Sequence, residues 1–321
     1  TTPPTAPTPS NHPPAPCITD YEIRRTVKAL DVKSAHGDDD IPIVVIKESL
    51  EVLMPWLRFI YNESIHRGWF PSAWKIAKTV IIPKPGKPDY DVAKAYRPIA
   101  LSCIMAKVME GIMTKRLTYH IETQKRINQA QTGFRAHHSI NTHLTRVVSF
   151  IRRSWAQSLK PSLVLLDLSS AYDRVDHHLL LDKLAKLDVP SYMCAWVTAF
   201  LSHRRVYLTN ESHKSDVYWL FMGVPQGSPI SPVLFIIFID DLLGSLSSWV
   251  AVFTYADDVT LGYAGPTTYD TILKLQEAIR VALSWARDNG QSFASEKFEL
   301  IHLARRTPWE TLSEGFIELE G

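Results

Sequence analysis

Three aspartates stand where a protein could hold divalent metal ions. Asp167 ends a four-residue apolar run typical of a buried strand, so its carboxylate is expected at the edge of a sheet. Asp257 and Asp258 separate two apolar stretches, 249–254 and 259–263, and are predicted to lie at the turn between two strands. Neighbouring carboxylates repel each other, bound cations relieve that repulsion, and Mg²⁺ prefers carboxylate oxygens. Two such ions can activate a 3′-hydroxyl and stabilise a leaving pyrophosphate.

The elements that would position these aspartates mix helices with strands that lie far apart in the sequence. An Asp-Asp pair alone is ordinary turn chemistry, so the interpretation depends on this framework. The order favours an α+β fold, with an antiparallel sheet backed by helices, over a regular βαβ series. We predict strands at 74–82, 163–166, 206–208, 217–220, 249–254 and 259–263, and helices from Thr19, at 43–67, at 105–120, within 131–154, at 232–243 and at 271–288.

The composition is that of a globular protein with room for about two domains. The 321 residues are 45% apolar and 21% charged. The three cysteines lack the spacing of a zinc ribbon or a disulfide framework, and the longest apolar run, 233–239, is too short to cross a bilayer. We therefore expect a soluble, intracellular protein. Trp56, Trp69 and Trp74 are predicted to lie in the core, with stacking on a nucleic-acid base as the alternative for one of them.

The net charge of +2 hides an uneven distribution. Residues 74–160 carry 16 Lys and Arg against 4 Asp and Glu, a net charge of +12, which leaves −10 for the rest of the chain. This division is expected of a protein that holds a phosphate backbone with one part and metal ions with another. A solvated basic face would give the same count, so charge alone does not decide between the two interpretations.

Three sequence blocks around the aspartates resemble motifs A, B and C of reverse transcriptases. They are 165–173 (LLDLSSAYD), 223–235 (GVPQGSPISPVLF) and 255–258 (YADD). The blocks 82–87 (IPKPGK), 96–101 (YRPIAL), 131–135 (QTGFR) and 293–297 (FASEK) are similar to the flanking blocks of non-LTR (LINE-type) retrotransposon polymerases, the last one to fungal elements. The resemblance covers roughly residues 19–306, and the order of the blocks makes it specific.

The resemblance implies the fingers and palm of a right-hand polymerase, an α+β fold. Residues 1–18 are then a Pro-rich linker, 19–160 the N-terminal extension and fingers, and 161–306 the palm, with part of the fingers at about 195–222. Residues 307–321 would be a truncated C-terminal tail. Because only 24 residues follow Lys297, we expect the thumb to be missing.

Carried over to this sequence, the resemblance implies that Asp167, Asp257 and Asp258 bind two catalytic Mg²⁺ ions, which Mn²⁺ could replace. Lys297 lies in the motif D block and is a candidate to protonate pyrophosphate. The three aspartates would then be the catalytic residues of an RNA-directed DNA polymerase, a nucleotidyltransferase.

Five further residues match positions that contact the incoming nucleotide. Tyr172 matches the aromatic steric gate under its sugar, although a core aromatic beside a strand would look the same. Gln226 and Gly227 match the loop that touches nucleotide and template, where glycine permits a close backbone approach. Arg97 and Lys84 match finger residues that neutralise the triphosphate, with a solvent-exposed cation as the alternative, above all for Lys84.

One segment departs from the family pattern. Where the family usually has Lys-Ala-Pro-Gly-Pro-Asp-Gly-Ile-Pro, residues 33–42 read KSAHGDDDIP, with fewer turn-forming residues and more acids. This indicates a copy whose sequence has diverged from the family, and it puts the expected N-terminal contact with the template in doubt.

The sequence therefore predicts the reverse transcriptase domain of a retrotransposon, with an RNA template, a DNA primer and dNTPs as partners and no membrane. The full-length element would add the missing endonuclease and thumb domains. The alternative is a catalytically inactive, nucleic-acid-binding remnant of such an element; a generic two-metal nuclease would need neither the loop at Gln226 nor an aromatic gate. We expect action in the nucleus on genomic DNA, and leave an organelle location open.

Overall fold

The structure of the protein is a computed structural model that describes residues 15–210 and 213–304. Most of the predicted linker and the predicted tail at 307–321 therefore lie outside the described residues. The contacts divide the chain into two compact units. Unit 1 comprises Thr1–Gln124 and Asp176–Leu234, and unit 2 comprises Lys125–Val175 and Phe235–Gly321. This division differs from the predicted fingers and palm boundaries, because 125–160 cluster with unit 2.

The helices of unit 1 begin and end where local sequence signals place them. In α1, Thr19 and Glu22 form a capping box in which each side chain bonds the other residue's backbone N–H. The predicted helix over 43–67 is broken at Ser49 into two. The helices are α1 (Asp20–Ala29), α2 (Ile43–Glu48), α3 (Leu50–Arg67), α4 (Ile104–Thr123), α6 (His177–Lys186) and α7 (Ser191–Leu201), with 3₁₀ turns at Ser72–Lys75 and Ala93–Ala95.

The sheet of unit 1 combines antiparallel and parallel pairs. Its order is β2-β1-β4-β5, and β6 also pairs with β4. The antiparallel β4–β6 pair joins the predicted strands 206–208 and 217–220, whereas the parallel β1–β4 pair was not predicted. The strands are β1 (Ile76–Pro83), β2 (Tyr96–Leu101), β4 (Arg204–Asn210), β5 (His213–Lys214) and β6 (Tyr218–Leu220).

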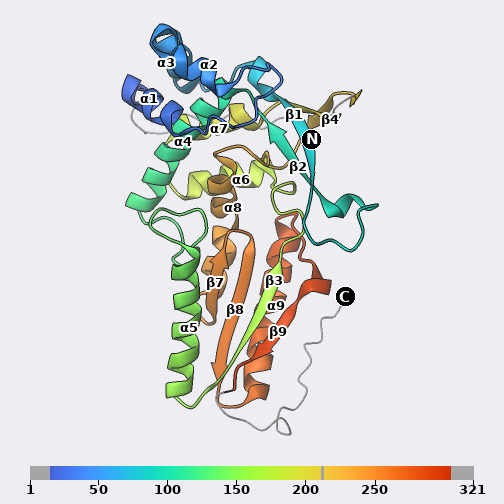
Figure 1. Cartoon of the computed structure of the whole chain (residues 1–321). Coiled ribbons are helices and arrows are strands. Elements are labelled where there is room, and N and C mark those ends of the chain that lie inside the picture. The colour runs from blue at the N-terminus through green and yellow to red at the C-terminus, as the bar shows by residue number, and fades with distance from the viewer. Residues whose placement is uncertain (1–14, 211–212, 305–321) are drawn as a thin grey trace. The chain divides into compact units, whose positions relative to one another are not determined.

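Unit 2 is built on a four-stranded antiparallel sheet of order β7-β8-β3-β9. Helix α9 packs against β8 and β3, and α5 packs against β7 and β3, so the predicted antiparallel sheet backed by helices is confirmed here (Figure 1). The strands are β3 (Lys160–Asp167), β7 (Ala251–Tyr255), β8 (Asp258–Gly265) and β9 (Glu299–His302); the helices are α5 (Ile140–Ala156), α8 (Ser231–Leu246, which starts in unit 1) and α9 (Thr268–Asp288), with a 3₁₀ turn at Ser295–Lys297.

The three tryptophans predicted to lie in the core differ from one another. Trp74 is buried and packs edge-on against Tyr61 and Phe70. Trp56 and Trp69 are 66% and 47% exposed, so the prediction is wrong for both. Bulky apolar residues near a helix end are not necessarily covered, because a surface includes much apolar area.

None of the helices formed by the described residues has the length and apolar character that crossing a membrane requires.

A buried carboxylate and a buried guanidinium act on each other electrostatically in the interior of unit 1. Glu110 on α4 and Arg204 on β4 are 0% and 2% exposed. Burial raises the pKa of Glu110, and the charge of Arg204 and a hydrogen bond donated by the Ser228 hydroxyl oppose that shift. Because Ser228 belongs to the loop that contains Gln226 and Gly227, this pair also anchors the loop from inside the unit.

The substitution Glu110→Gln keeps the side chain's size but leaves the Arg204 guanidinium buried without its opposite charge. Leaving a buried charge uncompensated costs up to about 3–5 kcal/mol, so we expect a loss of up to that order in the free energy of unfolding, measured by urea denaturation. The matched control is Glu63→Gln, which breaks the Glu63–Arg67 pair on α3, where Arg67 is largely exposed, and costs at most about 0.5 kcal/mol. Equal losses for the two variants would contradict the role of Glu110.

Candidate active site

Asp167 and Asp258 lie directly opposite each other at the ends of two neighbouring strands. In the antiparallel register of β3 and β8, Asp167 pairs with Asp258. Directly opposed residues of such a pair place their side chains on the same face, with Cβ atoms about 5 Å apart. Asp257 sits beside them at the tip of the predicted hairpin turn, since Tyr255 and Asp258 close the β7–β8 pairing. The structure therefore brings all three aspartates together in unit 2.

The charges of Asp257 and Asp167 influence the ionisation of Asp258. Burial, followed by the charges of Asp257 and Asp167, raises the pKa of Asp258. Lys297 opposes this shift: its ammonium forms an ion pair with Asp167 Oδ2, and this hydrogen bond raises the pKa of Lys297 in turn. The end of β3 is thus a point of surplus negative charge, with one cation beside it.

This arrangement fits an open site for a divalent ion better than a closed cage. Among the described residues, no three His, Cys, Asp or Glu side chains converge to form a preformed metal cage. Mg²⁺ in enzymes is typically held by one or two carboxylates, several waters and substrate phosphates. The opposed carboxylates of Asp167 and Asp258, with Asp257 at the adjacent turn, supply such a donor set. Burial and then repulsion by the other two aspartates raise the pKa of Asp258, and a bound cation would relieve that repulsion.

The turn that carries Asp257 is held by the amide of Gln131. The Gln131 side chain is fully buried; its Oε1 accepts from the backbone N–H of Ala256 at 3.1 Å and of Gly133 at 2.8 Å, and its Nε2 donates to the Ala256 carbonyl at 3.1 Å. Ala256 needs this support, since its φ of 62° lies in the left-handed region that costs a non-glycine residue about 1 kcal/mol or more. Gly133 allows the approach, because a Cβ there would lie 2.1 Å from the Ala256 nitrogen.

Gln131 had been singled out only as part of a flanking block, with no role in the site. Its position 125 residues before Ala256 gives no local signal of the contact. The available hint was the pairing of a polar Gln with a nearby Gly inside a block that resembles the family, a combination that often marks a close backbone approach.

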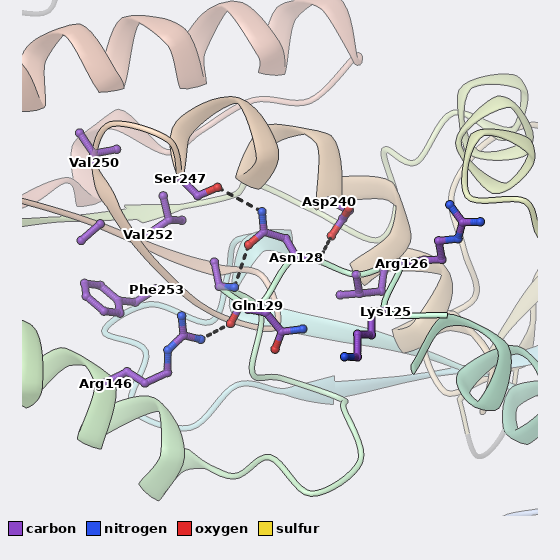
Figure 2. Close-up of a pocket in the computed structure, with 13 residues that line it drawn as sticks. Lys125, Arg126, Asn128, Gln129, Arg146, Asp240, Ser247, Val250, Val252 and Phe253 are labelled. Carbon is purple, nitrogen blue, oxygen red and sulfur yellow. Dashed lines mark hydrogen bonds between the residues drawn. The ribbon is translucent and has the colours of Figure 1, made fainter. Parts of the chain in front are cut away.

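A groove with a volume of about 810 Å³ runs beside β7, next to the Gln131 segment (Figure 2). Asn128 organises it: its backbone N–H donates to Asp240 at 2.7 Å, its Nδ2 donates to Ser247 at 3.2 Å, and its Oδ1 accepts from the Ala130 N–H at 2.8 Å. Arg146 of α5 donates to the Gln129 carbonyl. The groove contains none of the predicted site residues, and its polar contacts fix the backbone that leads into Gln131.

Tyr172 lies in the same unit as the three aspartates. Its ring stacks on Phe235 of α8, with centroids 5.0 Å apart and an interplanar angle of 14°. Burial, and then the charge of Asp257, raises the pKa of the Tyr172 hydroxyl, so this group shares the electrostatic environment of the turn. The ring is therefore fixed in place while remaining partly accessible.

The other predicted nucleotide contacts lie in unit 1. The Gln226 carbonyl accepts from the Ala100 N–H of β2 at 2.7 Å, and Gly227, with φ 106°, lies so close that a Cβ would be 2.8 Å from the Ala100 oxygen. The glycine therefore permits a close approach, here of the loop to β2. Arg97 is exposed on β2. Lys84 follows β1, and its ammonium donates to the Lys94 carbonyl at 3.0 Å.

The predicted site residues thus form two groups. Unit 2 gathers the metal-binding candidates and the gate, and unit 1 holds the remaining nucleotide contacts on the β1–β2 hairpin and the adjoining loop. The first group is Asp167, Asp257, Asp258 and Tyr172, with Lys297; the second is Gln226, Gly227, Arg97 and Lys84.

Charge substitutions around Asp258 are expected to move its pKa in opposite directions. Lys297→Met removes the ammonium that favours the ionised form, so the pKa of Asp258 should rise further. Asp257→Asn removes a neighbouring negative charge, so the pKa should fall toward that of an ordinary aspartate. A ¹³C NMR pH titration of the carboxyl carbon, without divalent ions, measures both; an unchanged pKa in both variants would contradict the proximity of these groups.

Gln131→Leu keeps the side chain's approximate size but leaves the Ala256 backbone groups buried without the amide. Unsatisfied buried groups cost about 1–3 kcal/mol, so we expect a loss of stability of that order and faster hydrogen exchange at the Ala256 N–H. The control, Gln129→Leu, changes an exposed side chain on the same segment and should leave the Ala256 exchange rate unaltered. Equal exchange rates of the Ala256 N–H in the two variants would contradict the role of the Gln131 amide in holding this turn.

Comparison with known proteins relates the chain to polymerases of mobile elements. The reverse transcriptase (RNA-dependent DNA polymerase) family matches residues 82–313. The chain is 30% identical over 300 residues to the RNA-directed DNA polymerase from mobile element jockey of Drosophila melanogaster, covering 92% of this chain and 32% of that protein. It is 29% identical to the probable RNA-directed DNA polymerase from transposon X-element of the same species, covering 89% of this chain and 32% of that protein.

A more distant relative is the Pol polyprotein from type-1 retrotransposable element R2 of Popillia japonica, 25% identical and covering 84% of this chain and 37% of that protein. The chain spans about a third of the length of these relatives. They are insect elements, so the similarity of 293–297 to fungal elements stays a prediction.

A solved structure shares the fold. Apo telomerase from Candida tropicalis, truncated from its C-terminal domain, superposes with a TM-score of 0.55 at 12% identity, over 79% of this chain and 56% of that one. The predicted α+β fold, that of the fingers and palm of a right-hand polymerase, is confirmed.

Proposed function

The chain belongs to the reverse transcriptase (RNA-dependent DNA polymerase) family, and on this premise we propose that it adds deoxynucleotides to the 3′ end of a DNA primer on an RNA template. The observation that carries the proposal is the pairing of Asp167 with Asp258 across β3 and β8, with Asp257 at the adjoining turn. This is a donor set for divalent ions at the edge of an otherwise apolar sheet, as two-metal nucleotidyl transfer requires.

The family depends on divalent metal ions, and we propose Asp167, Asp257 and Asp258 as the residues that would hold two Mg²⁺. When bound, such ions favour deprotonation of a 3′-hydroxyl and stabilise the charge of a departing pyrophosphate. The protein's own contribution is to hold three carboxylates together against their repulsion. Lys297 lies beside Asp167, and a lysine ammonium carries its proton at neutral pH, so we propose Lys297 as the proton donor to pyrophosphate.

We further propose Tyr172 as the residue that discriminates against ribonucleotides. Its stacking on Phe235 fixes the ring plane, and the influence of Asp257 on its hydroxyl puts it beside the turn that would hold a metal. A fixed aromatic edge below the sugar leaves no room for a 2′-hydroxyl. Gln226, Gly227, Arg97 and Lys84, all in unit 1, are the residues that we propose for contacts to base and triphosphate.

The altered segment 33–42 supports an intact fold rather than an inactive remnant. Lys107 Nζ donates to the Ala35 carbonyl at 2.6 Å. Gly37 packs so closely on the residues between β2 and α4 that a Cβ would lie 2.5 Å from the Cys103 nitrogen. Asp38 accepts a hydrogen bond from the Tyr207 hydroxyl. The segment 33–42, including the acidic Asp38, is thus part of the packing of unit 1. Because the relatives are polymerases, the remnant interpretation is not favoured.

RNA template, DNA primer and dNTPs are the proposed partners, and we place the action inside the cell, in the nucleus when genomic DNA is the target. In the full-length element, endonuclease and thumb domains would act together with this chain. The small share of the relatives' length that the chain spans supports this larger assembly.

Primer extension on an RNA template with dNTPs and Mg²⁺ tests the activity. Asp257→Asn should lower incorporation at least about 100-fold, because loss of a metal ligand removes several kcal/mol of transition-state stabilisation at about 1.4 kcal/mol per tenfold. Asp288→Asn, at an exposed position at the end of α9, is the control and should retain the wild-type rate. No incorporation by the wild-type chain at any enzyme excess, with RNA binding retained, would favour the binding remnant.

The gate is tested by the ratio of ribonucleotide to deoxynucleotide incorporation. Tyr172→Ala removes the ring, so this ratio should rise about tenfold or more, the discrimination expected of a pocket that excludes a single added group. Tyr172→Phe keeps the ring on Phe235 and should retain the wild-type ratio. Equal ratios in Tyr172→Ala and the wild type would remove Tyr172 from this role.

A further inference from the structure

The edge of the unit 2 sheet is covered along only part of β7. β7 is the end strand of this sheet, with β8 on its other side. The backbone groups of Thr254 point away from β8: its N–H donates to the Ala130 carbonyl at 3.1 Å, and its carbonyl accepts from the Thr132 N–H at 2.9 Å. Residues 130–132 thus extend the sheet by one parallel bridge. Backbone groups two residues apart on a strand point the same way, so those of Val252 face the same outer edge.

Asn128 turns the chain away from this edge before it reaches Val252. A straight continuation of the bridge would bring the Ala130 N–H to the Val252 carbonyl. Instead, that N–H donates to Asn128 Oδ1 at 2.8 Å, while Asn128 itself binds Asp240 and Ser247 (Figure 2). Within the described part of the chain, no other residue takes the place of Ala130 at the outer edge of Val252.

The groove of about 810 Å³ beside β7 is the space that this turn leaves. Residues 250–253 form one wall, and the departing segment 125–130 forms the opposite one. Its volume lies within the range of about 300–1,000 Å³ that is usual for binding sites. Open backbone at a sheet edge is a template for another strand, and proteins usually cover it. An extended peptide binds such an edge by adding a strand to the sheet.

The charges of the groove indicate which kind of peptide fits. Its lining contains one carboxylate, Asp240, which already accepts a backbone hydrogen bond, and three cations, Lys125, Arg126 and Arg146. Burial and then the charge of Arg135 lower the pKa of Arg146, so Arg146 lies in a positive environment. No Asp or Glu in the described part of the chain forms an ion pair with Lys125 or Arg146. A carboxylate on an incoming strand would supply the opposite charge.

The edge backbone favours a peptide over a nucleic-acid strand. Phosphate oxygens accept hydrogen bonds and donate none, so they could satisfy the Val252 N–H but not its carbonyl. A peptide backbone offers both an N–H and a C=O, repeating with the period of β7. The apolar side chains of Ile127 and Phe253 in the lining also suit the side chains of a strand.

We propose that the groove beside β7 is a docking site for an extended, acidic peptide segment of a partner protein. The segment adds a strand to the unit 2 sheet at Val252 and places its carboxylates against Lys125 and Arg146. None of the three aspartates of the candidate metal site lines the groove, so docking requires neither a metal ion nor a nucleotide. The proposal is therefore independent of the polymerase activity.

Hydrogen exchange tests the proposal on the full chain, labelled with ¹⁵N-valine and kept free of metal ions and nucleotides. The signals are assigned from Val252→Ile and Val259→Ile. In the free protein, the outward N–H of Val252 should exchange fast. The N–H of Val259 should exchange slowly, because its strand, β8, is paired on both sides.

The probe is the synthetic peptide acetyl-Thr-Glu-Val-Glu-Val-Glu-Thr-amide. When it fills about nine-tenths of the sites, the exchange of the Val252 N–H should slow about tenfold, because only the free tenth exchanges. The rate at Val259 should stay the same. An unaltered rate at Val252 with millimolar peptide would overturn the proposal.

Two variants of α5 and a second peptide test the role of charge. Arg146→Gln removes the charge but keeps a side chain that can donate to the Gln129 carbonyl. The affinity for the Glu peptide should fall about tenfold, as expected when a charge-assisted hydrogen bond is lost. Arg152→Gln makes the same change at an exposed position of α5 outside the groove and should retain the wild-type affinity.

A peptide with Lys in place of each Glu should leave the exchange of the Val252 N–H unchanged. Equal affinities of the two variants for the Glu peptide, or equal effects of the two peptides, would overturn the acidic specificity.

A single-stranded oligouridylate distinguishes a peptide from nucleic acid at this groove. We expect it to leave the exchange of the Val252 N–H unchanged, because phosphates cannot complete the edge pairing. Slower exchange at Val252 with the oligouridylate, together with no effect of the Glu peptide, would overturn the proposal and assign the groove to nucleic acid.

Discussion

The structure of unit 2 depends on keeping like charges together at the end of an apolar sheet. Asp167 and Asp258 are opposed because β3 and β8 pair along eight consecutive residues, and this long ladder fixes the register on which their proximity depends. A slip of one residue would turn one carboxylate to the other face. Lys297, which pairs with Asp167, offsets the repulsion between the two carboxylates. The Gln131 amide holds the turn beside them, and Gly133, which has no side chain, lets the two backbone segments approach each other.

Unit 1 likewise fixes the loop around Gln226 and Gly227 through contacts on two sides. The backbone around Gln226 and Gly227 carries polar groups and a left-handed glycine, and it is held on one side by β2 and on the other by Ser228, which reaches the buried Glu110. The charge of Arg204 favours the ionised form of Glu110 inside the unit. Both units therefore use a buried polar contact to fix a segment that carries predicted site residues.

The sequence predicted the parts of this arrangement that have a local pattern. The apolar run before Asp167 and the two apolar stretches around Asp257 specified strands and a turn, and the structure confirms them. The break at Ser49, the parallel β1–β4 pair and the Gln131 contact were not predicted, because each is settled by packing between residues distant in sequence. Trp56 and Trp69 were placed in the core on hydrophobicity alone, although apolar character does not ensure burial.

The central claim is that the three aspartates form one site for divalent cations, and paramagnetic NMR tests it most directly. Mn²⁺, titrated into chain labelled with ¹³C at the aspartate carboxyl carbons, broadens only the signals of groups close to the bound ion. The account predicts that the signals of Asp167, Asp257 and Asp258 broaden together at low Mn²⁺, are restored by excess Mg²⁺, and that the signal of Asp288 stays sharp. Broadening that is absent from the three aspartates, or equal at Asp288, would contradict it.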